Sequence, residues 1–212
     1  MQTAAKFWDR LADRYAKSPI DDMEAYEYTL GRTRSYLKET DRVLELGCGT
    51  GMTAVTLAGA AGSVVASDLS ANMVEIGKHR AAEAGARNVS FVQAGVDDEG
   101  LREDPYDVVM AFNLLHLIED TDAALAQIGE MVRPGGLFIS KTVCLAEGGG
   151  TLKLRLLMLA LPLMQLIGKA PFVRFLKITE LESAVELAGF KIIEAGNFPA
   201  KPPTRYLVAR KL

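Results

Sequence analysis

The stretch Val43-Leu-Glu-Leu-Gly-Cys-Gly-Thr-Gly51 decides the fold of this 212-residue chain. Its first half is a short apolar run, which is typical of a buried strand. Gly47, Gly49 and Gly51 follow at alternate positions, and backbone without a Cβ atom can approach a ligand closely. Apolar residues after the turn suit a helix. We therefore predict a strand, a glycine turn and a helix N-terminus, whose free N–H groups suit a nucleotide-like ligand.

The spacing of these glycines argues against a dinucleotide site. Such a site needs glycines at the first, third and sixth positions, and the sixth position here is Met52. Glu45 stands just before the turn and favours a cationic ligand over a phosphate. A dehydrogenase is therefore disfavoured.

At these residues the chain resembles the class I S-adenosylmethionine-dependent methyltransferases, whose first motif reads Glu-x-Gly-x-Gly-x-Gly. Glu45 and the three glycines match this motif in full. The resemblance implies that S-adenosylmethionine binds here and leaves as S-adenosylhomocysteine. The residues implied at the amino acid end of this donor are Glu45, Gly47, Cys48, Gly49 and Gly51.

Apolar strands alternate with helical segments along most of the chain, which predicts a parallel, doubly wound α/β sheet. We expect a three-layer fold with seven strands, mostly parallel, and an antiparallel strand at the C-terminus. The predicted strands are 42–46, 63–68, 89–93, 106–112, 136–142, 190–195 and 205–211. The predicted helices are 3–17, 24–37, 52–60, 71–84, 120–131 and 179–188, the last opened by a capping box from Thr179 to Glu182.

We expect one methyltransferase domain over residues 1–212. Its parts are an N-terminal helical lid (1–40), a cofactor-binding core (42–142), an apolar cap insertion (146–178) and a C-terminal helix with two strands (179–212). Both N-terminal helices precede the first strand, so we expect them over the edge or mouth of the sheet.

Asp68 ends the second strand, and a carboxylate there can accept hydrogen bonds from both hydroxyls of a ribose. The resemblance implies this role for Asp68, with Leu69 and Met73 beside it. The alternative is that Asp68 only caps the next helix beside Ser70.

The third family motif usually has an acid where this chain has Gly95. The adenine amino group then lacks its usual acceptor, and Asp97 could supply one only if the loop bends back. The backbone N–H of Val96 remains available to hold the ring. The resemblance also places Asn113 and Leu114 against the methionine part of the donor.

Two residues are candidates for catalysis. His116 follows the fourth strand and is the best candidate for a general base, should the acceptor need one. The alternative is that it only packs or hydrogen-bonds at a helix start. Tyr15 matches the family's entrance segment, in which a tyrosine closes over the cofactor, and the alternative is that it packs.

Residues 156–167 are apolar except for Gln165, but the run is shorter than the ~20 residues that span a bilayer. Residues 141–177 hold six basic groups and one acid, a local charge of +5. Three interpretations stay open for residues 151–177. They form a lid over an apolar small-molecule acceptor, a helix that packs or makes a homodimer, or a surface that rests on an anionic membrane to reach a lipid or quinone-like acceptor.

Composition restricts the possible partners, metal sites and location of the protein. The net charge of −3 leaves no electrostatic footprint for nucleic acid. Two cysteines are too few for a disulfide framework or a zinc site, so we predict no metal and a cytoplasmic location. The N-terminus carries charges where a signal peptide needs an apolar core. We predict methyl transfer to a small, apolar acceptor, and the alternative is a protein that binds S-adenosylmethionine without transferase activity.

Overall fold

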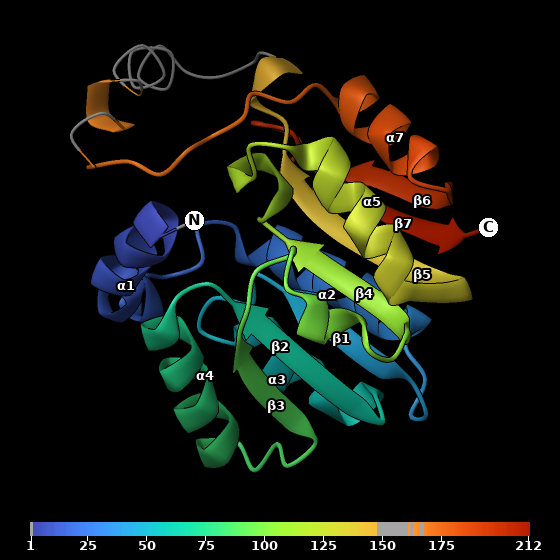
Figure 1. Cartoon of the computed structure of the whole chain (residues 1–212), viewed down its shortest axis with the longest axis horizontal. Helices are drawn as coiled ribbons and strands as arrows, with labels where there is room; N and C mark the ends of the chain where they lie inside the picture. The colour runs from blue at the N-terminus through green and yellow to red at the C-terminus, as the bar shows by residue number, and fades with distance from the viewer. Residues whose placement is uncertain (1, 148–160, 162, 166–167) are drawn as a thin grey trace.

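Seven strands form one sheet in the order β3-β2-β1-β4-β5-β7-β6 (Figure 1). The computed structural model describes residues 2–147, 161, 163–165 and 168–212. Neighbouring strands from β3 to β5 pair in parallel, whereas β7 runs antiparallel to both β5 and β6. The predicted fold class is confirmed. The strands are β1 (Arg42–Leu46), β2 (Ser63–Asp68), β3 (Val89–Gln93), β4 (Tyr106–Phe112), β5 (Val132–Val143), β6 (Phe190–Asn197) and β7 (Thr204–Lys211).

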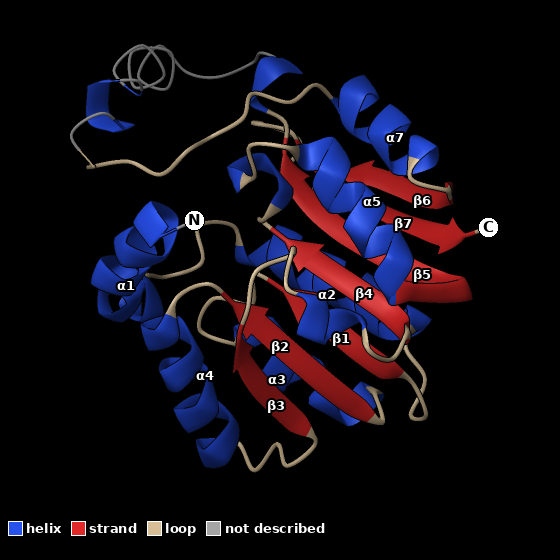
Figure 2. Cartoon of the chain, in the orientation of Figure 1, coloured by secondary structure: helices blue, strands red, loops and turns tan. Residues whose placement is uncertain are grey.

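Helices cover both faces of the sheet and complete three layers (Figure 2). Successive residues of a strand point to opposite faces, so Val43 and Leu44 of β1 belong to different core clusters. The Val43 cluster packs against α3 (Met52–Leu57), and α4 (Ala71–Glu83) lies beside α3. The Leu44 cluster packs against α5 (Thr121–Met131) and α7 (Ile178–Leu187). β1 is therefore buried on both faces, as its apolar run predicts.

The strand order reverses direction at β1, which lies between β2 and β4. Ligands of doubly wound sheets bind at such a switch point, beyond the carboxyl ends of the strands. The loops that begin after Leu46, Asp68, Gln93 and Phe112 all leave the sheet at this edge. Helix α1 (Gln2–Lys17) lies at the same edge and contacts α4 (Figure 1).

Helix α2 (Met23–Tyr36) lies over a face of the sheet, so its predicted place at the edge or mouth was wrong. Its Tyr36 packs against the Val43 cluster, and Thr33 Oγ1 lies 3.2 Å from Tyr206 Oη in the core. Tyr36 Oη also donates a hydrogen bond to Glu194 of β6, at 2.7 Å. The helix can approach closely because small threonines face the sheet, where Thr29 and Thr33 are both buried.

Several element boundaries differ from prediction by one or more residues, and two of these differences have a clear structural cause. Strand β5 begins at Val132, four residues early, because Val132 pairs with Tyr106 before the register shifts to Val108 and Leu137. Gly135 accommodates the extra residues with φ at 75°. The capping box was placed too late, since α7 begins at Ile178 and the carboxylate of Glu180 accepts the backbone N–H of Lys177.

The apolar run 151–167 falls mostly outside the described residues. The three interpretations of residues 151–177 depend on this run, so they also lie outside what the structure describes. The chain after this run passes near the mouth of the sheet before α7, and Leu176 there is buried. Among the helices that the structure describes, none is long and apolar enough to cross a membrane.

Candidate functional site

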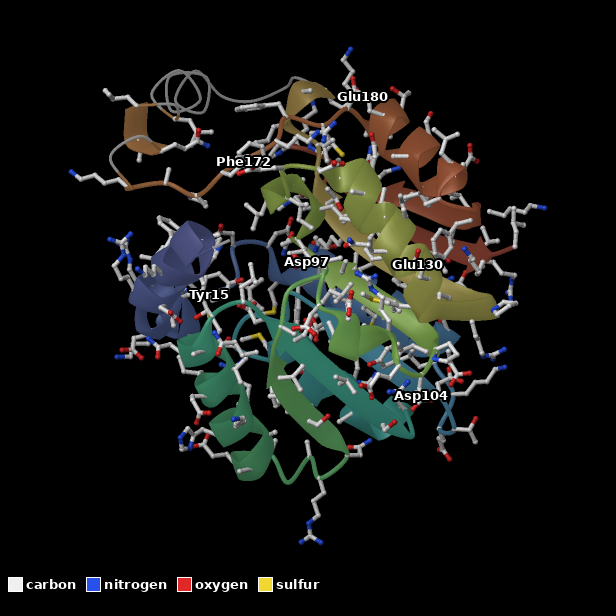
Figure 3. The ribbon with its side chains drawn as sticks, viewed as in Figure 1. Tyr15, Asp97, Asp104, Glu130, Phe172 and Glu180 are labelled. Atoms are coloured by element: carbon white, nitrogen blue, oxygen red, sulfur yellow. The ribbon has the colours of Figure 1, made fainter. Side chains whose placement is uncertain are left out.

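A cavity of about 420 Å³ opens at the switch point of the sheet, a size typical of small-molecule sites. Ten of the residues predicted from the sequence line it. They are Tyr15, Gly47, Gly49, Asp68, Leu69, Met73, Val96, Asp97, Asn113 and Leu114. Four predicted residues do not, namely Glu45, Cys48, Gly51 and His116. Figure 3 shows Tyr15, Asp97 and Phe172, which reach the cavity from three separate parts of the chain.

The glycine turn keeps the floor of the cavity open. Gly47, Gly49 and Gly51 have φ values of 65°, 54° and 72°, a conformation that favours glycine. A Cβ atom on Gly47 would lie 2.7 Å from the side chain of Leu114, so even alanine would crowd the opposite wall. Backbone therefore forms this part of the wall, as the sequence predicts.

Asp68 joins the glycine turn to the start of α4. Its carboxylate accepts the N–H groups of Gly49, at 2.9 Å, and Ser70, at 2.8 Å. The N-cap of α4 is Ser70, whose side chain accepts the N–H of Met73, so Asp68 itself is not the cap. Burial raises the pKa of Asp68 despite these two hydrogen bonds. The carboxylate is thus fixed on the cavity wall, and further hydrogen-bond donors from a ligand would stabilise its ionised form.

Glu45 lies beneath the turn rather than on the cavity wall. It is 3% exposed, and its Oε2 has no hydrogen-bond partner among the described residues. Burial raises the pKa of Glu45 to about 8, while a hydrogen bond from the backbone of Ala54 lowers it. A buried carboxyl with an unused oxygen, beneath a turn without Cβ atoms, fits a cationic ligand end.

The pKa of Glu45 predicts a pH-dependent stability. The native state binds its proton up to about pH 8, whereas an unfolded glutamate releases it near pH 4.3. The stabilisation is complete below the unfolded pKa and is lost as pH rises to about 8. We expect the parent protein to lose roughly 2–4 kcal/mol relative to Glu45→Gln between pH 5 and pH 9. Urea titrations at both pH values measure this, and a pH-independent difference would contradict it.

The loop after β3 bends back, as Asp97 requires if it is to replace the acid missing at Gly95. A Cβ atom on Gly95 would lie 2.6 Å from Oδ1 of Asp97 and 3.0 Å from Leu69. The N–H of Asp98 donates to the carbonyl of Gly95, which closes the turn. The Asp97 carboxylate therefore fills the space that a side chain at position 95 would occupy.

This geometry predicts that position 97 supplies the acceptor for an exocyclic amino group. We expect Asp97→Ala to weaken donor binding about tenfold, since a hydrogen bond to a charged group contributes roughly 1.5 kcal/mol or more. The exchange variant Gly95→Asp with Asp97→Gly returns a carboxylate to this space and should recover most of the loss. Calorimetric titration tests both variants. Equal affinity of Asp97→Ala and the parent would remove Asp97 from the site.

The two candidate catalytic residues have different surroundings. Tyr15 lines the cavity beside Gly49 and makes an edge contact with Trp8, with 6.3 Å between ring centroids. Burial, then the charges of Asp68 and Glu45, raise the pKa of the Tyr15 phenol. His116 lies in the 3₁₀ turn Leu115–Leu117, and burial lowers the pKa of His116 to about 4. Its Nδ1 has no partner among the described residues.

The sequence did not identify several apolar residues of the wall. Trp8, Phe112, Leu117 and Phe172 line the cavity together with the predicted set. Trp8 belongs to the helix predicted over residues 3–17, and aromatic residues at helical spacing indicate only a buried helix face. Phe172 lies in a connector without periodicity, so no local pattern marks it. Among the described residues, no cluster of His, Cys, Asp or Glu could hold a metal ion.

Solved structures confirm the architecture. The CcbJ methyltransferase of Streptomyces caelestis aligns over 99% of this chain and 98% of its own, with a TM-score of 0.75 and 24% identity. The structure of DhpI in complex with SAH aligns over 99% and 96%, with a TM-score of 0.74 and 23% identity. At this identity the likeness concerns the fold alone. The fold and the cavity at its switch point define a class I methyltransferase-like α/β protein.

Comparison with known sequences relates the core of this chain to a protein family. A family model described as a methyltransferase domain matches residues 43–136. The ubiquinone biosynthesis O-methyltransferase of Azorhizobium caulinodans is 28% identical over 76% of this chain and 63% of its own length. The demethylmenaquinone methyltransferase of Clavibacter sepedonicus is 34% identical over 47% and 40%. Residues 43–136 of this chain are therefore similar to a methyltransferase domain, and the whole chain has the class I methyltransferase fold. The matched part spans less than two thirds of these relatives.

Proposed function

We propose that this chain transfers a methyl group from S-adenosylmethionine to a small, apolar acceptor. The observation that carries the proposal is the shared cavity of the glycine turn, Asp68 and Asp97, which matches the donor in charge and in hydrogen-bonding groups. The donor supplies an electrophilic methyl group on its sulfonium. Asp68 holds the ribose hydroxyls, Glu45 attracts the ammonium group of the donor's amino acid end, and the turn offers backbone N–H groups to its carboxylate. We further propose that the protein acts as a single domain in the cytoplasm.

Positioning is the main contribution that these residues make. Holding donor and acceptor in line can lower a barrier by roughly 7–11 kcal/mol. Trp8, Leu117 and Phe172 offer apolar surface around the remaining space and would exclude water from it. In this proposal no side chain forms a covalent bond to the substrate.

The charges of the cavity restrict the acceptor. The lining holds the carboxylates of Asp68, Asp97, Glu119 and Asp120, and none of its described residues is Lys, Arg or His. Such a lining repels an anionic acceptor and accepts a neutral one. The charges therefore support an acceptor without a negative charge that carries a hydroxyl, an amine or a reactive carbon.

A charge-matched acceptor series tests this proposal. One aromatic scaffold is offered as the neutral phenol, the phenyl carboxylate and the phenyl sulfonate, and S-adenosylhomocysteine is quantified by mass spectrometry. We expect turnover with the neutral member and at least about tenfold less with the anions. Preferential methylation of an anionic member would contradict the proposed acceptor class. Donor binding without turnover on any acceptor would favour the alternative, a binding protein without transferase activity.

We propose His116 as the general base for an acceptor that must lose a proton, acting through one bridging water because its own side chain does not line the cavity. Its depressed pKa keeps the imidazole neutral from pH 5 upward, so the His116-dependent part of the rate should be flat there and fall near pH 4. We expect His116→Ala to lower turnover about 10²-fold and donor affinity less than twofold. Equal turnover of variant and parent would exclude this role. His79→Ala, an exposed histidine on α4, is the control.

The relatives favour one finer version of the acceptor. One of them is named for ubiquinone biosynthesis and another for demethylmenaquinone, which suggests a quinone-like phenol carrying an apolar tail. In this version residues 151–177 rest on an anionic membrane surface through their basic side chains. Flotation with liposomes tests it, and recovery of the protein with anionic but not neutral vesicles is the expected result. If the protein floats with neither kind of vesicle, the acceptor would be limited to free small molecules. Light scattering would show whether the protein forms a dimer.

A further inference from the structure

One turn of α1 makes three different connections. Trp8 lines the cavity, Asp9 bonds to the start of α4, and Arg10 bonds to the chain that follows the cap. Because successive helical residues point about 100° apart, this turn can contact three partners at once. The turn thus lies between the donor half of the site and the segment that covers the other half.

Asp9 binds the loop that carries the proposed ribose ligand. Its Oδ1 accepts the hydroxyl of Ser70 at 2.6 Å and the backbone N–H of Asn72 at 3.2 Å. Asn72 Nδ2 returns a hydrogen bond to the backbone oxygen of Asp9, at 3.1 Å. Ser70 lies two residues after Asp68 and donates its own N–H to the Asp68 carboxylate. A continuous set of hydrogen bonds therefore joins α1 to Asp68.

The opposite side of the same turn is bonded to the covering segment. Arg10 donates a hydrogen bond to the carbonyl of Gly168, at 3.2 Å. Further along, the backbone N–H of Arg174 donates to the backbone carbonyl of His116 at 2.7 Å, and its guanidinium donates to the carbonyl of Glu119. Phe172, between these two anchors, lines the cavity. The segment 168–174 is thus held to α1 at one end and to the loop after β4 at the other.

We propose that Asp9 is a positioning residue that latches α1 onto the start of α4, so that the donor site and the acceptor cover are completed together. This inference rests on the proposed function, because the loop that Asp9 holds is the proposed donor loop. Donor contacts with Asp68 order Ser70 and Asn72, and these hold Asp9. The latched helix keeps Trp8 and Tyr15 over the donor and presents Arg10 to Gly168.

The chain has a single tryptophan, Trp8, so its fluorescence reports the position of α1 directly. We expect Asp9→Ala to shift Trp8 emission to longer wavelength, to raise the donor dissociation constant about tenfold, and to raise donor KM more than it lowers kcat. Asp9→Asn keeps an acceptor oxygen for Ser70 and Asn72 and should stay within about threefold of the parent. Asp13→Ala removes an exposed carboxylate one turn further along the helix and is the matched control.

The outcomes separate this inference from the proposed function. Parent-like emission and donor affinity in Asp9→Ala would overturn the latch, and so would an Asn variant as impaired as the Ala variant. Should Asp9→Ala not fold, Asn72→Ala removes one of the three hydrogen bonds and is expected to show the same shifts in smaller size. A parent protein that does not bind the donor would refute the proposed function, whereas the emission of the donor-free variants would still report the latch.

Discussion

Replacing Asp68 by alanine should weaken binding of S-adenosylmethionine by at least about 100-fold. Two hydrogen bonds from ribose hydroxyls to a carboxylate contribute roughly 3 kcal/mol or more together, and both are lost. The variant should still fold, with a free energy of unfolding lower by roughly 1–3 kcal/mol, because the N–H groups of Gly49 and Ser70 lose their acceptor. Calorimetry and urea unfolding of the same preparation measure the two quantities.

Asp68→Asn separates the charge of this residue from its shape. The amide oxygen can still accept one of the two loop N–H groups, those of Gly49 and Ser70, so the glycine turn should keep its conformation. We expect intermediate donor affinity and parent-like stability. Donor affinity unchanged in the alanine variant would show that the ribose is bound elsewhere.

Replacing Gly51 by alanine should destabilise the protein by about 1–3 kcal/mol. Gly51 is the N-cap of α3 and has φ at 72°, which alanine adopts only under strain. Its Cβ atom would also lie 2.6 Å from the ring of Phe91 and 3.2 Å from the Cα of Gly77. Neither neighbour can move freely, because the Phe91 ring packs against both glycines and the Gly77 contact is with backbone. Donor affinity should fall as well, since the turn must shift.

Two variants make the Gly51 experiment specific. Gly59→Ala changes a glycine with no heavy atom within 4 Å of the added Cβ, and its unfolding free energy should stay within about 0.5 kcal/mol of the parent. Shortening Phe91 to leucine in the Gly51→Ala background should recover part of the loss by removing the collision. A Gly51→Ala protein as stable as the parent would contradict the packing described around the turn.

The sheet was predictable because its strands are separated by clear turn signals. The short apolar runs of β1 and β4 indicate burial on both faces, whereas the strand order that sets the switch point came from the structure. The places of the glycine turn and Asp68 were predictable, since the turn directly follows β1 and Asp68 is the last residue of β2. Whether Asp97 reaches the cavity depends on a bend in its loop that only the structure shows. Leu69, from another loop, limits the space above Gly95.

Other features depend on contacts between distant segments. The position of α2 follows from the fit of Thr33 against Tyr206, which are far apart in the sequence. Asp9 looks like an ordinary exposed helical acid until α4 is placed beside it. Phe172 reaches the cavity from a connector whose path is set by Arg174. His116 lies after β4 as predicted, yet its burial and its place outside the cavity lining required the packed structure.

Acceptor-dependent release of S-adenosylhomocysteine is the most direct test of the central claim. The parent protein and Asp68→Ala are incubated with methyl-labelled S-adenosylmethionine and a panel of neutral aromatic acceptors, and labelled product and S-adenosylhomocysteine are counted together. We expect equal amounts of both from the parent protein, only when an acceptor is present, and at least about 100-fold less from the variant at low donor concentration. Equal release from parent and variant, or no donor binding by the parent, would contradict the account.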